Sequence, residues 1–566
     1  MARALARTAR WWIAVSLAGF VLLAWGVGLP AKPEGPVLGT EPWSLVLIGF
    51  LGLVGLSWLL SWRWVGVAAV MLATVACGLT AVAALTYRPG VAVAVAVVFF
   101  LPAAALWLAW QHQRSARAVA GLALVTLVLV GTVAAVGIRV YDSNFGPTHP
   151  SSNTSAQPVD RVEWIWSGGV TTTHAAVVAR LHGEAEVAEL EVHPAGASEG
   201  HVVRGAPDAD GIVRWRVEDL EPGTAYTYSV VVDGDRDAGR GTGQFRTSTT
   251  GPAAITVAVG ACARTGSNGA VFDAIHAVDP DLFVSTGDLH YGNVADDDPD
   301  AFLSLYDRVL TAPAQAALYR ALPVAYIWDD HDYGPNNADA TSPSRDAARS
   351  AYRQAVPHHP LAAGQEGGIY HAFTMGRVRF VLTDTRSERT ETSMLGRRQL
   401  AWLLDEIGTA SRTHAVVVWV NPDPWIAPAD PARDDWGGYA GERRRIADAI
   451  AEAGTDNLVM LSGDAHMVAL DDGTNSDYST SGGGGGFPVL HAAALDRPGR
   501  VKGGPYSDGT FPGGGQFGVL SVHDDGGADV TVDLAGRDWT GAVLVERSFT
   551  IPVPSTARDG PPVTRP

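Results

Sequence analysis

The feature that most restricts the fold of this chain is a series of apolar, strand-like segments that each end in polar residues. After residue 250 these segments alternate with helical patterns, and they read AITVAVGAC, DLFVSTGD, PVAYIWDDHD, RVRFVLTDTR, HAVVVWVNP and NLVMLSGDAH. Such alternation predicts a layered domain of sheets and helices, in which ligand sites gather at the carboxyl ends of the strands. We therefore expect one site to form from these polar ends within residues 251–553.

The polar ends are rich in residue types that bind metal ions. They comprise Cys262-Ala-Arg264, Gly287-Asp288 with His290 and Tyr291, Trp328-Asp329-Asp330-His331-Asp332, Asp384-Thr-Arg386, Asn421-Pro-Asp423 and Gly463-Asp464-Ala-His466. Thiol, imidazole, phenol and carboxylate groups together are the donor set of a metal centre. On a strand, Asp464 and His466 would point to the same face. Asp384 and Arg386 are expected to form a structural ion pair.

These motifs resemble those of the calcineurin-like metallophosphoesterases and, more closely, those of the PhoD-like (alkaline phosphatase D) family. The resemblance rests on Cys262 in place of the superfamily's first Asp, the spacing of Asp288 and Tyr291, the WDDHD string followed by Gly334-Pro335-Asn336, and the Gly-Asp-Ala-His motif. It covers residues 155–550. It implies an α+β fold, the αββα metallophosphoesterase sandwich. The implied activity is that of a metal-dependent phosphodiesterase or alkaline phosphatase, in which a metal-bound hydroxide attacks phosphorus in line.

The resemblance also implies roles for individual residues. The implied metal ligands are Cys262, Asp288, Tyr291, Asp330, Asn336, Asp464 and His466, and the implied catalytic residues are His331, Asp330 and Arg264. Asp288 would bridge two cations, and the second would be held by Asp330, Asn336 or both. His331 would donate a proton to the leaving oxygen or stabilise its charge, while Arg264 would contact a phosphate oxygen or have a surface or ion-pair role.

The metals that the resemblance implies are ferric iron and calcium, with other divalent ions as alternatives. Asn421 stands where many members of the superfamily have a His, and it is a candidate contact to metal or phosphate. An amide oxygen binds a hard cation better than a soft one, which favours calcium over zinc or iron at the second site.

Residues 159–250 show a different pattern, of short alternating strands separated by turn residues. This pattern predicts an all-β sandwich like a fibronectin type III domain, with Tyr226 or Tyr228 as its corner tyrosine. We expect this sandwich to pack beside the next domain. The Ser-, Asn- and Pro-rich residues 141–158 are predicted to form a linker, and residues 554–566 a disordered tail.

Five apolar runs without charged residues occupy the first 140 residues, at about 11–29, 43–60, 65–86, 91–110 and 118–138. Each is long enough to cross a ~30 Å hydrocarbon core, so residues 1–140 are predicted to form an all-α domain of five transmembrane helices. Basic residues gather on the side of the N-terminus, which predicts a cytoplasmic N-terminus. We thus expect a multi-pass plasma-membrane protein with an extracytoplasmic catalytic domain and the lipid bilayer as a partner.

Charge limits the class of partner further. The chain has 41 basic and 59 acidic residues, and the acidic excess lies after residue 140. An acidic surface repels a phosphate backbone, so no nucleic acid partner is expected. The expected substrate is a phosphate ester of a small molecule, a cell-wall polymer or a lipid head group. The alternatives are a phospholipase-type hydrolase of lipid head groups and a catalytically weak metal-binding module on a membrane anchor.

Overall fold

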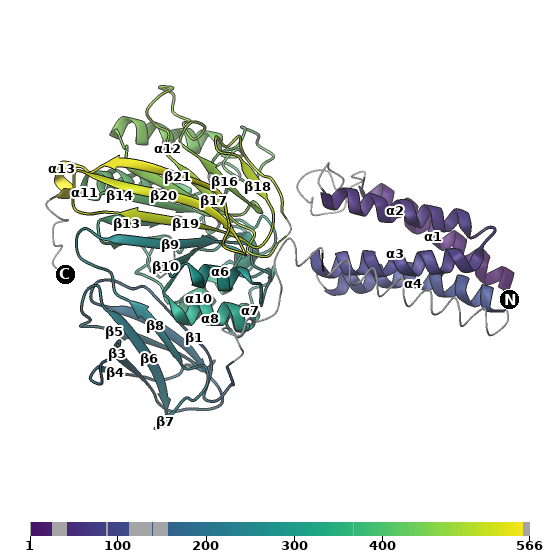
Figure 1. Cartoon of the computed structure of the whole chain (residues 1–566), viewed down its shortest axis with the longest axis horizontal. Helices are drawn as coiled ribbons and strands as arrows, with labels where there is room; N and C mark the ends of the chain where they lie inside the picture. Colours follow the sequence, from purple (N-terminus) through teal and green to yellow (C-terminus); the bar gives the residue numbers. More distant parts are fainter. Residues whose placement is uncertain are drawn as a thin grey trace. The chain divides into compact units, whose positions relative to one another are not determined.

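The computed structural model describes residues 2–24, 42–86, 89–112, 139, 157–365, 367–497 and 499–558. The chain divides into two compact units, Met1–Ser143 and Asn144–Pro566. Figure 1 shows that the described part of the first unit consists of helices and that the second unit holds the sheets.

Helices form the described part of the first unit. They are α1 (Ala2–Ala24), α2 (Pro42–Leu60), α3 (Val65–Thr86) and α4 (Pro89–Gln111). Their shared core includes Ile13, Val54, Leu72 and Phe99, one from each helix. A polar contact also joins α1 to the end of α2, because Arg10 Nε donates a hydrogen bond of 3.1 Å to Ser61 Oγ.

The membrane prediction for this unit is contradicted. Crossing the hydrocarbon core takes about 20 consecutive apolar residues in one helix. Within the described ranges, no helix has both the length and the apolar character that this requires. The predicted all-α domain of five transmembrane helices is therefore wrong, and so is the predicted multi-pass plasma-membrane location with an extracytoplasmic catalytic domain. A bilayer partner is not supported, and the helix predicted at 118–138 lies outside the described residues.

The second unit begins with a β-sandwich. One sheet has the order β1-β2-β5, and the other has the order β4-β3-β6-β7, with β8 paired to β6. The strands are β1 (Val162–Gly168), β2 (Ala175–Leu181), β3 (Ala188–Pro194), β4 (His201–Gly205), β5 (Ile212–Val217), β6 (Ala225–Val232), β7 (Asp235–Arg236) and β8 (Thr242–Arg246). In β6, alternate residues are buried, among them Tyr226 and Tyr228. The Tyr226 hydroxyl accepts a hydrogen bond from the Glu221 N–H (2.9 Å), so Tyr226 is the corner tyrosine.

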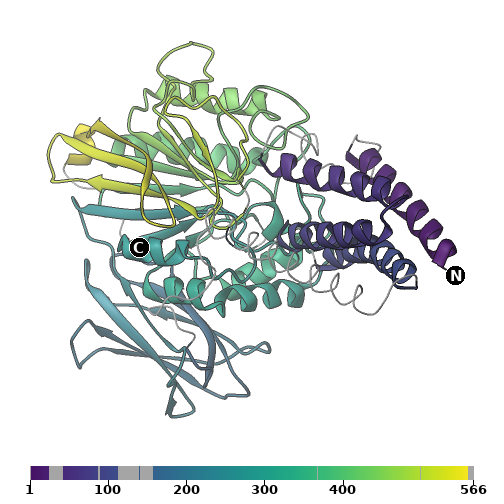
Figure 2. The same ribbon diagram turned by 45° about the vertical axis from the view of Figure 1, so that its right-hand side comes forward.

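Two mixed sheets follow and pack face to face (Figures 1 and 2). The first has the order β11-β10-β9-β19-β20-β21, and the second β12-β13-β14-β15-β17-β16-β18. Their strands are β9 (Ala254–Gly260), β10 (Leu282–Ser285), β11 (Val324–Tyr326), β12 (His371–Met375), β13 (Val378–Leu382), β14 (Val416–Asn421), β15 (Leu458–Ser462), β16 (Met467–Asp471), β17 (Val489–Ala492), β18 (Thr510–Pro512), β19 (Gln516–His523), β20 (Asp529–Asp538) and β21 (Val543–Pro552). Val257 and Leu520 of the first sheet share a buried core with Phe380 and Val418 of the second.

Helices flank these sheets. They are α6 (Val271–Ala277), α7 (Pro299–Leu310), α8 (Pro313–Ala321), α9 (Asp330–Tyr333), α10 (Arg345–Ala355), α11 (Gly396–Thr413), α12 (Ala440–Ala453) and α13 (Ser555–Arg558). The helices α6, α7, α8 and α10 share the core of the first sheet, while α11 and α12 pack with β14 and β15 of the second. Strands β9, β10 and β11 run parallel, as do β13, β14 and β15, so their carboxyl ends can meet at one edge.

The sandwich has a core of its own, and one face of its β1 sheet packs into the core of the stacked sheets. Trp164 and Trp166 of β1 are buried in the same cluster as the first sheet. The indole of Trp164 donates to Asp307 Oδ1 on α7 (2.7 Å), and that of Trp166 donates to the Ala355 carbonyl at the end of α10 (2.9 Å). Residues 555–558 of the predicted disordered tail form α13, and residues 559–566 lie outside the described residues.

Candidate metal centre

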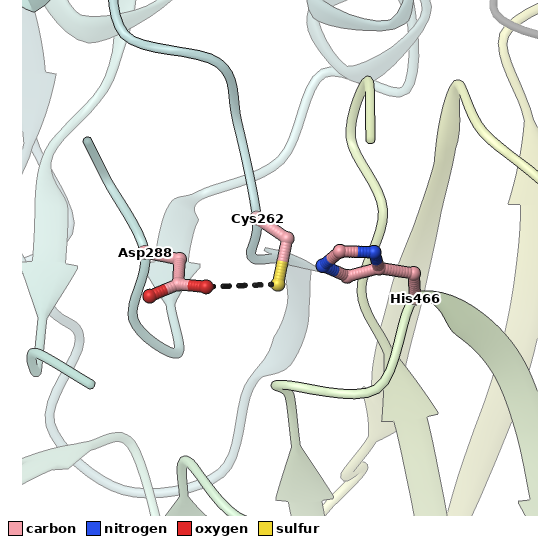
Figure 3. A group of neighbouring side chains, drawn as sticks. All are labelled: Cys262, Asp288 and His466. Atoms are coloured by element: carbon pink, nitrogen blue, oxygen red, sulfur yellow. Dashed lines mark hydrogen bonds between the residues drawn. The ribbon is translucent and has the colours of Figure 1, made fainter. Parts of the chain in front are cut away.

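Three chain segments bring Cys262, Asp288 and His466 together (Figure 3). Cys262 follows β9, Asp288 follows β10, and His466 lies in the turn between β15 and β16. The Cys262 thiol donates to Asp288 Oδ2 at 3.5 Å, and one ligand atom from each of the three residues lies within 4.8 Å of the others. Figure 3 shows the sulfur between the carboxylate and the imidazole.

Backbone strain is concentrated at this centre. Cys262, Asp288 and Asp464 have φ angles of 61°, 53° and 69°, in the left-handed region that non-glycine residues seldom occupy. Strain of this kind persists where the surrounding structure holds it, and it clusters at functional sites. Gly287 has a φ of 105°, and a Cβ there would clash with the Asp329 backbone and Cβ. The glycine before Asp288 is therefore a steric requirement.

Tyr291 completes the first group of donors. Its hydroxyl lies 3.2 Å from His466 Nε2, and its ring centroid lies 4.4 Å from that of His331. The guanidinium of Arg497 stacks over the ring at 4.1 Å. These contacts place the phenol beside the His466 imidazole, and the Tyr291 side chain packs against the cluster that contains Cys262.

A second group of donors shares Asp288 with the first. Ligand atoms of Asp288, Asp330 and His331 lie within 4.8 Å of one another. Asp330 begins α9, and its carboxylate accepts hydrogen bonds from the backbone N–H groups of His331 (2.8 Å) and Asn337 (2.7 Å). The His331 Nδ1 lies 2.7 Å from Asn293 Oδ1, a contact that the sequence did not indicate. A carboxylate common to two adjacent groups is the arrangement of a two-cation centre.

The electrostatics of the two groups favour a bound cation. Burial raises the pKa of the Asp288 carboxyl, and it raises the pKa of the Cys262 thiol and the Tyr291 phenol well above their usual values. Asp288 Oδ1 is also buried without a hydrogen-bond partner in the described part of the chain. A cation supplies the missing charge, because it stabilises deprotonated ligands and accepts their lone pairs. The residues present therefore fit a metal ion.

Asp330 differs from its neighbours in charge state. Burial works against its carboxylate, but His331, Arg386 and the Asn337 N–H together lower the pKa of Asp330 to about 2. It is thus a preformed anion beside Asp288. Asp332, further along α9, is held by Tyr326 and by two backbone N–H groups, and burial raises its pKa to about 8.

Three predicted site residues have protein partners for their side chains. Asn336 is exposed, and its amide donates to Asn337 Oδ1 at 2.7 Å. Asn421 is buried at the end of β14, where Trp436 donates to its oxygen (3.1 Å) and its NH₂ donates to the Asp423 carbonyl (2.5 Å). The Arg264 guanidinium is 30% exposed and lies 3.5 Å from Asp496 Oδ2, which corresponds to its ion-pair alternative.

The predicted pair of Asp384 and Arg386 is wrong. The Asp384 carboxylate accepts the backbone N–H of Arg386 (3.0 Å), because it folds back on its own turn. The buried guanidinium pairs instead with Asp329 (Nε–Oδ1, 2.6 Å) and with Asp423 (Nη2–Oδ1, 3.0 Å). Arg389 donates to the second oxygen of Asp423 at 2.8 Å. This network holds Asp329, the residue before Asp330, in place. It could not be predicted from the sequence, because its members come from separate parts of the chain.

Asp464 takes part in a third group. Ligand atoms of Asp423, Asp434 and Asp464 lie within 4.8 Å of one another. The Asp464 carboxylate accepts a hydrogen bond from Lys502 Nζ at 2.6 Å, while its carbonyl oxygen lies 3.6 Å from Cys262 Sγ. Asp464 and His466 therefore face different groups, because they lie in a turn rather than on one strand.

Comparison with known proteins agrees with this geometry. Residues 257–487 match the family model of the PhoD-like phosphatases. Alkaline phosphatase D of Bacillus subtilis (strain 168) is 26% identical over 186 residues, which cover 26% of this chain. The chain spans about a third of the length of this curated relative (32%).

Solved structures show the same fold. The structure of PhoD has a TM-score of 0.56 at 18% identity, covering 73% of this chain and 92% of that one. Purple acid phosphatase PPD1 from yellow lupin (Lupinus luteus) seeds has a TM-score of 0.51 at 14% identity, covering 71% and 75%. Residues 257–487 are thus similar to the PhoD-like phosphatases in sequence, and the second unit shares the fold of PhoD.

Proposed function

We propose that this chain is a metal-dependent phosphoesterase that hydrolyses phosphate mono- or diesters at the centre around Asp288. The observation that carries the proposal is the convergence of Tyr291 and His466 on the buried pair of Cys262 and Asp288. The match of residues 257–487 to the PhoD-like phosphatases supports it. Asp288 is the residue common to both donor groups, so the reaction depends on it most.

The two donor groups suit different cations. Thiol, phenol and imidazole around Cys262, Tyr291 and His466 suit ferric iron, whereas the oxygens of Asp288 and Asp330 suit calcium, with other divalent ions as alternatives. When bound, such cations withdraw charge from the phosphate oxygens and lower the pKa of a water molecule. Asn336 and Asn421 remain predicted contacts of the second cation or of phosphate.

The remaining polar residues act on the substrate directly. His331 is oriented by Asn293 and lies beside Asp330, where it can deliver a proton to the leaving oxygen. Arg264 is the half-buried guanidinium at this edge, and its charge-assisted hydrogen bonds suit a phosphate oxygen. Burial of Cys262 and Asp288 keeps bulk water away from the donor atoms and strengthens each charge interaction there.

The direct test is hydrolysis of a chromogenic phosphodiester and a chromogenic monoester by the full chain. Turnover is measured with iron and calcium present, then after dialysis against a chelator, and again after each metal is returned. We expect turnover that the chelator abolishes and the metals restore. Turnover that survives complete metal removal would overturn the proposal, as would a metal-loaded, folded protein that hydrolyses neither ester class.

A further inference from the structure

Lysine is almost absent from this chain, and its one described lysine lies at the metal centre. Of the 41 basic residues, only Lys32 and Lys502 are lysines, and Lys32 lies outside the described ranges. Lys502 belongs to the segment between β17 and β18, and its side chain is 9% exposed. Nearly all basic residues of this chain are arginines, so the lysine at position 502 is an exception.

The ammonium of Lys502 lies between two carboxylates. Its Nζ is 2.6 Å from Asp464 Oδ2 and 2.7 Å from Asp434 Oδ1. These two residues and Asp423 form the third donor group described above. An ammonium is a compact point charge with three donors, so it fits between carboxylate oxygens as a small cation does, whereas a guanidinium is a wide, planar fork.

Side chains of the protein already balance the charge of this group. Both oxygens of Asp423 accept hydrogen bonds from guanidinium groups, one from Arg386 (3.0 Å) and one from Arg389 (2.8 Å). Lys502 pairs with the other two carboxylates. The third group therefore differs from the two groups that share Asp288, where Asp288 Oδ1 is buried without a partner among the described residues.

The segment that carries Lys502 also contacts the first donor group. The Arg500 N–H donates to the His466 carbonyl at 2.8 Å, and Arg497 stacks on the ring of Tyr291. Asp464 connects the two sides, since its carboxylate binds Lys502 while its carbonyl faces the Cys262 thiol at 3.6 Å. The ammonium is thus connected to the metal centre through Asp464.

We propose that Lys502 is a built-in cation of this centre: its ammonium fills the third carboxylate group in place of a metal ion, and Asp464 is its anchor rather than a metal ligand. The proposal rests on the proposed function, because it assigns the metal ions to the two groups that share Asp288. Lys502 is a positioning residue. It neutralises Asp434 and Asp464 and holds the turn that carries His466 against the centre.

The test is to count metal ions bound by the full chain. Each variant is loaded with iron and calcium, passed through a desalting column and analysed for metal content, and calcium binding is titrated by calorimetry. Lys502→Met removes the ammonium that lies between Asp434 and Asp464, so we expect this variant to bind one more calcium ion than the wild type. The double variant K502M/D434N should lose that ion again. Lys502→Arg keeps the charge, and Arg500→Met changes a neighbouring base of the same segment; both should retain the wild-type metal content.

Asp434→Asn in the wild-type background tests the proposal from the other side, even where Lys502→Met fails to fold. We expect its metal content to equal that of the wild type, because a lysine fills the group. Loss of one ion in Asp434→Asn would overturn the proposal, and so would an unchanged metal content in a folded Lys502→Met. Failure of the proposed function is a separate result, namely absence of ester hydrolysis by the metal-loaded wild type.

Discussion

Asp288 is the single residue on which both donor groups depend. Replacing it with Asn keeps the shape but removes the charge that a bridging ligand needs, so we expect Asp288→Asn to lower kcat/KM by at least ~10³-fold. The measurement is chromogenic ester turnover, with circular dichroism to confirm the fold. Asp281→Asn is the matched control, because Asp281 lies before β10, at the opposite end of that strand, and accepts a hydrogen bond from Thr256 N–H. Turnover of Asp288→Asn within tenfold of the wild type would refute the site.

Tyr291 contributes the phenol of the first donor group, and its ionised form bound to ferric iron would absorb visible light. We expect Tyr291→Phe to lose this band while Cys262, Asp288 and His466 still retain iron. The absorption spectrum is recorded together with the iron content. Tyr333→Phe serves as the control, because the Tyr333 hydroxyl bonds the Asp339 carbonyl (3.2 Å), away from the donor atoms. A colourless wild type that is fully active without iron would remove iron from the assignment.

Helix α9 is only four residues long, so its position depends on contacts from other elements. Asp329 and Asp332 cap it reciprocally, and Arg386, which follows β13, pairs with Asp329 and Asp423. Arg386→Met leaves the buried Asp329 without its guanidinium partner and Asp423 with Arg389 alone, and we expect it to lower the free energy of unfolding by about 3–5 kcal/mol. Guanidinium chloride unfolding measures this change.

Arg379 of β13 is the control for Arg386, because it also forms an ion pair but is less buried. Arg379 pairs with Glu406 at 2.7 Å, but both side chains are partly exposed, at 23% and 21%. Partly exposed pairs contribute little, so Arg379→Met should cost less than about 1 kcal/mol. Equal losses from the two variants would contradict the role given to the buried network.

Local sequence patterns explain why the strands and their polar ends could be predicted. The apolar residues of β9 and β10 specify buried parallel strands, and Cys262 and Asp288 follow directly at their ends. The partners of Arg386 could not be predicted, because Asp329 and Asp423 meet it only through the packing of separate strands. The role of Lys502 could not be predicted for the same reason. Its partners Asp434 and Asp464 are distant in the sequence, and the loop that carries it has no periodic pattern.

The apolar runs of the first unit led to a prediction that the structure contradicts. Uncharged stretches such as 65–86 predicted membrane spans, but the structure gives no described helix with the length and apolar character that a span requires. Apolar composition alone does not separate a helix that packs against other helices from one that crosses a bilayer, because both bury apolar side chains. Residues such as Leu72 and Phe99 are buried between helices of this unit.

The second unit is expected to unfold as one body, since Trp164 and Trp166 of the sandwich are buried in the core of the stacked sheets. Gly168 ends β1 where a Cβ would clash with the carbonyls of Pro357 and Val324. Gly168→Ala therefore forces the sandwich away from the first sheet, and we expect a loss of about 1–3 kcal/mol within a single transition. Gly441→Ala is the control, because that position on α12 has open space and an alanine there should be neutral or stabilising. Two separate calorimetric transitions in the second unit would contradict unfolding as one body.

Buried histidines give the molecule a calculable response to acid. Burial lowers the pKa of His371 to about 4, whereas an unfolded histidine titrates near 6.5. Between these values the unfolded chain binds the additional proton, so this residue makes the folded state less stable as pH falls. Removing it in His371→Gln should make the variant gain about 1.4 kcal/mol relative to the wild type for each pH unit between pH 6.5 and pH 4, with no further gain below that range. The difference is measured by denaturant unfolding of chelator-treated protein at several pH values.

Comparing the two proteins isolates one histidine, because other titrating groups are the same in both. The carboxyl of Asp332 is one of these groups; burial raises its pKa to about 8, so it changes stability with pH in the opposite direction to His371. Parallel stability curves would show that His371 accepts a proton in the folded state as readily as in the unfolded chain.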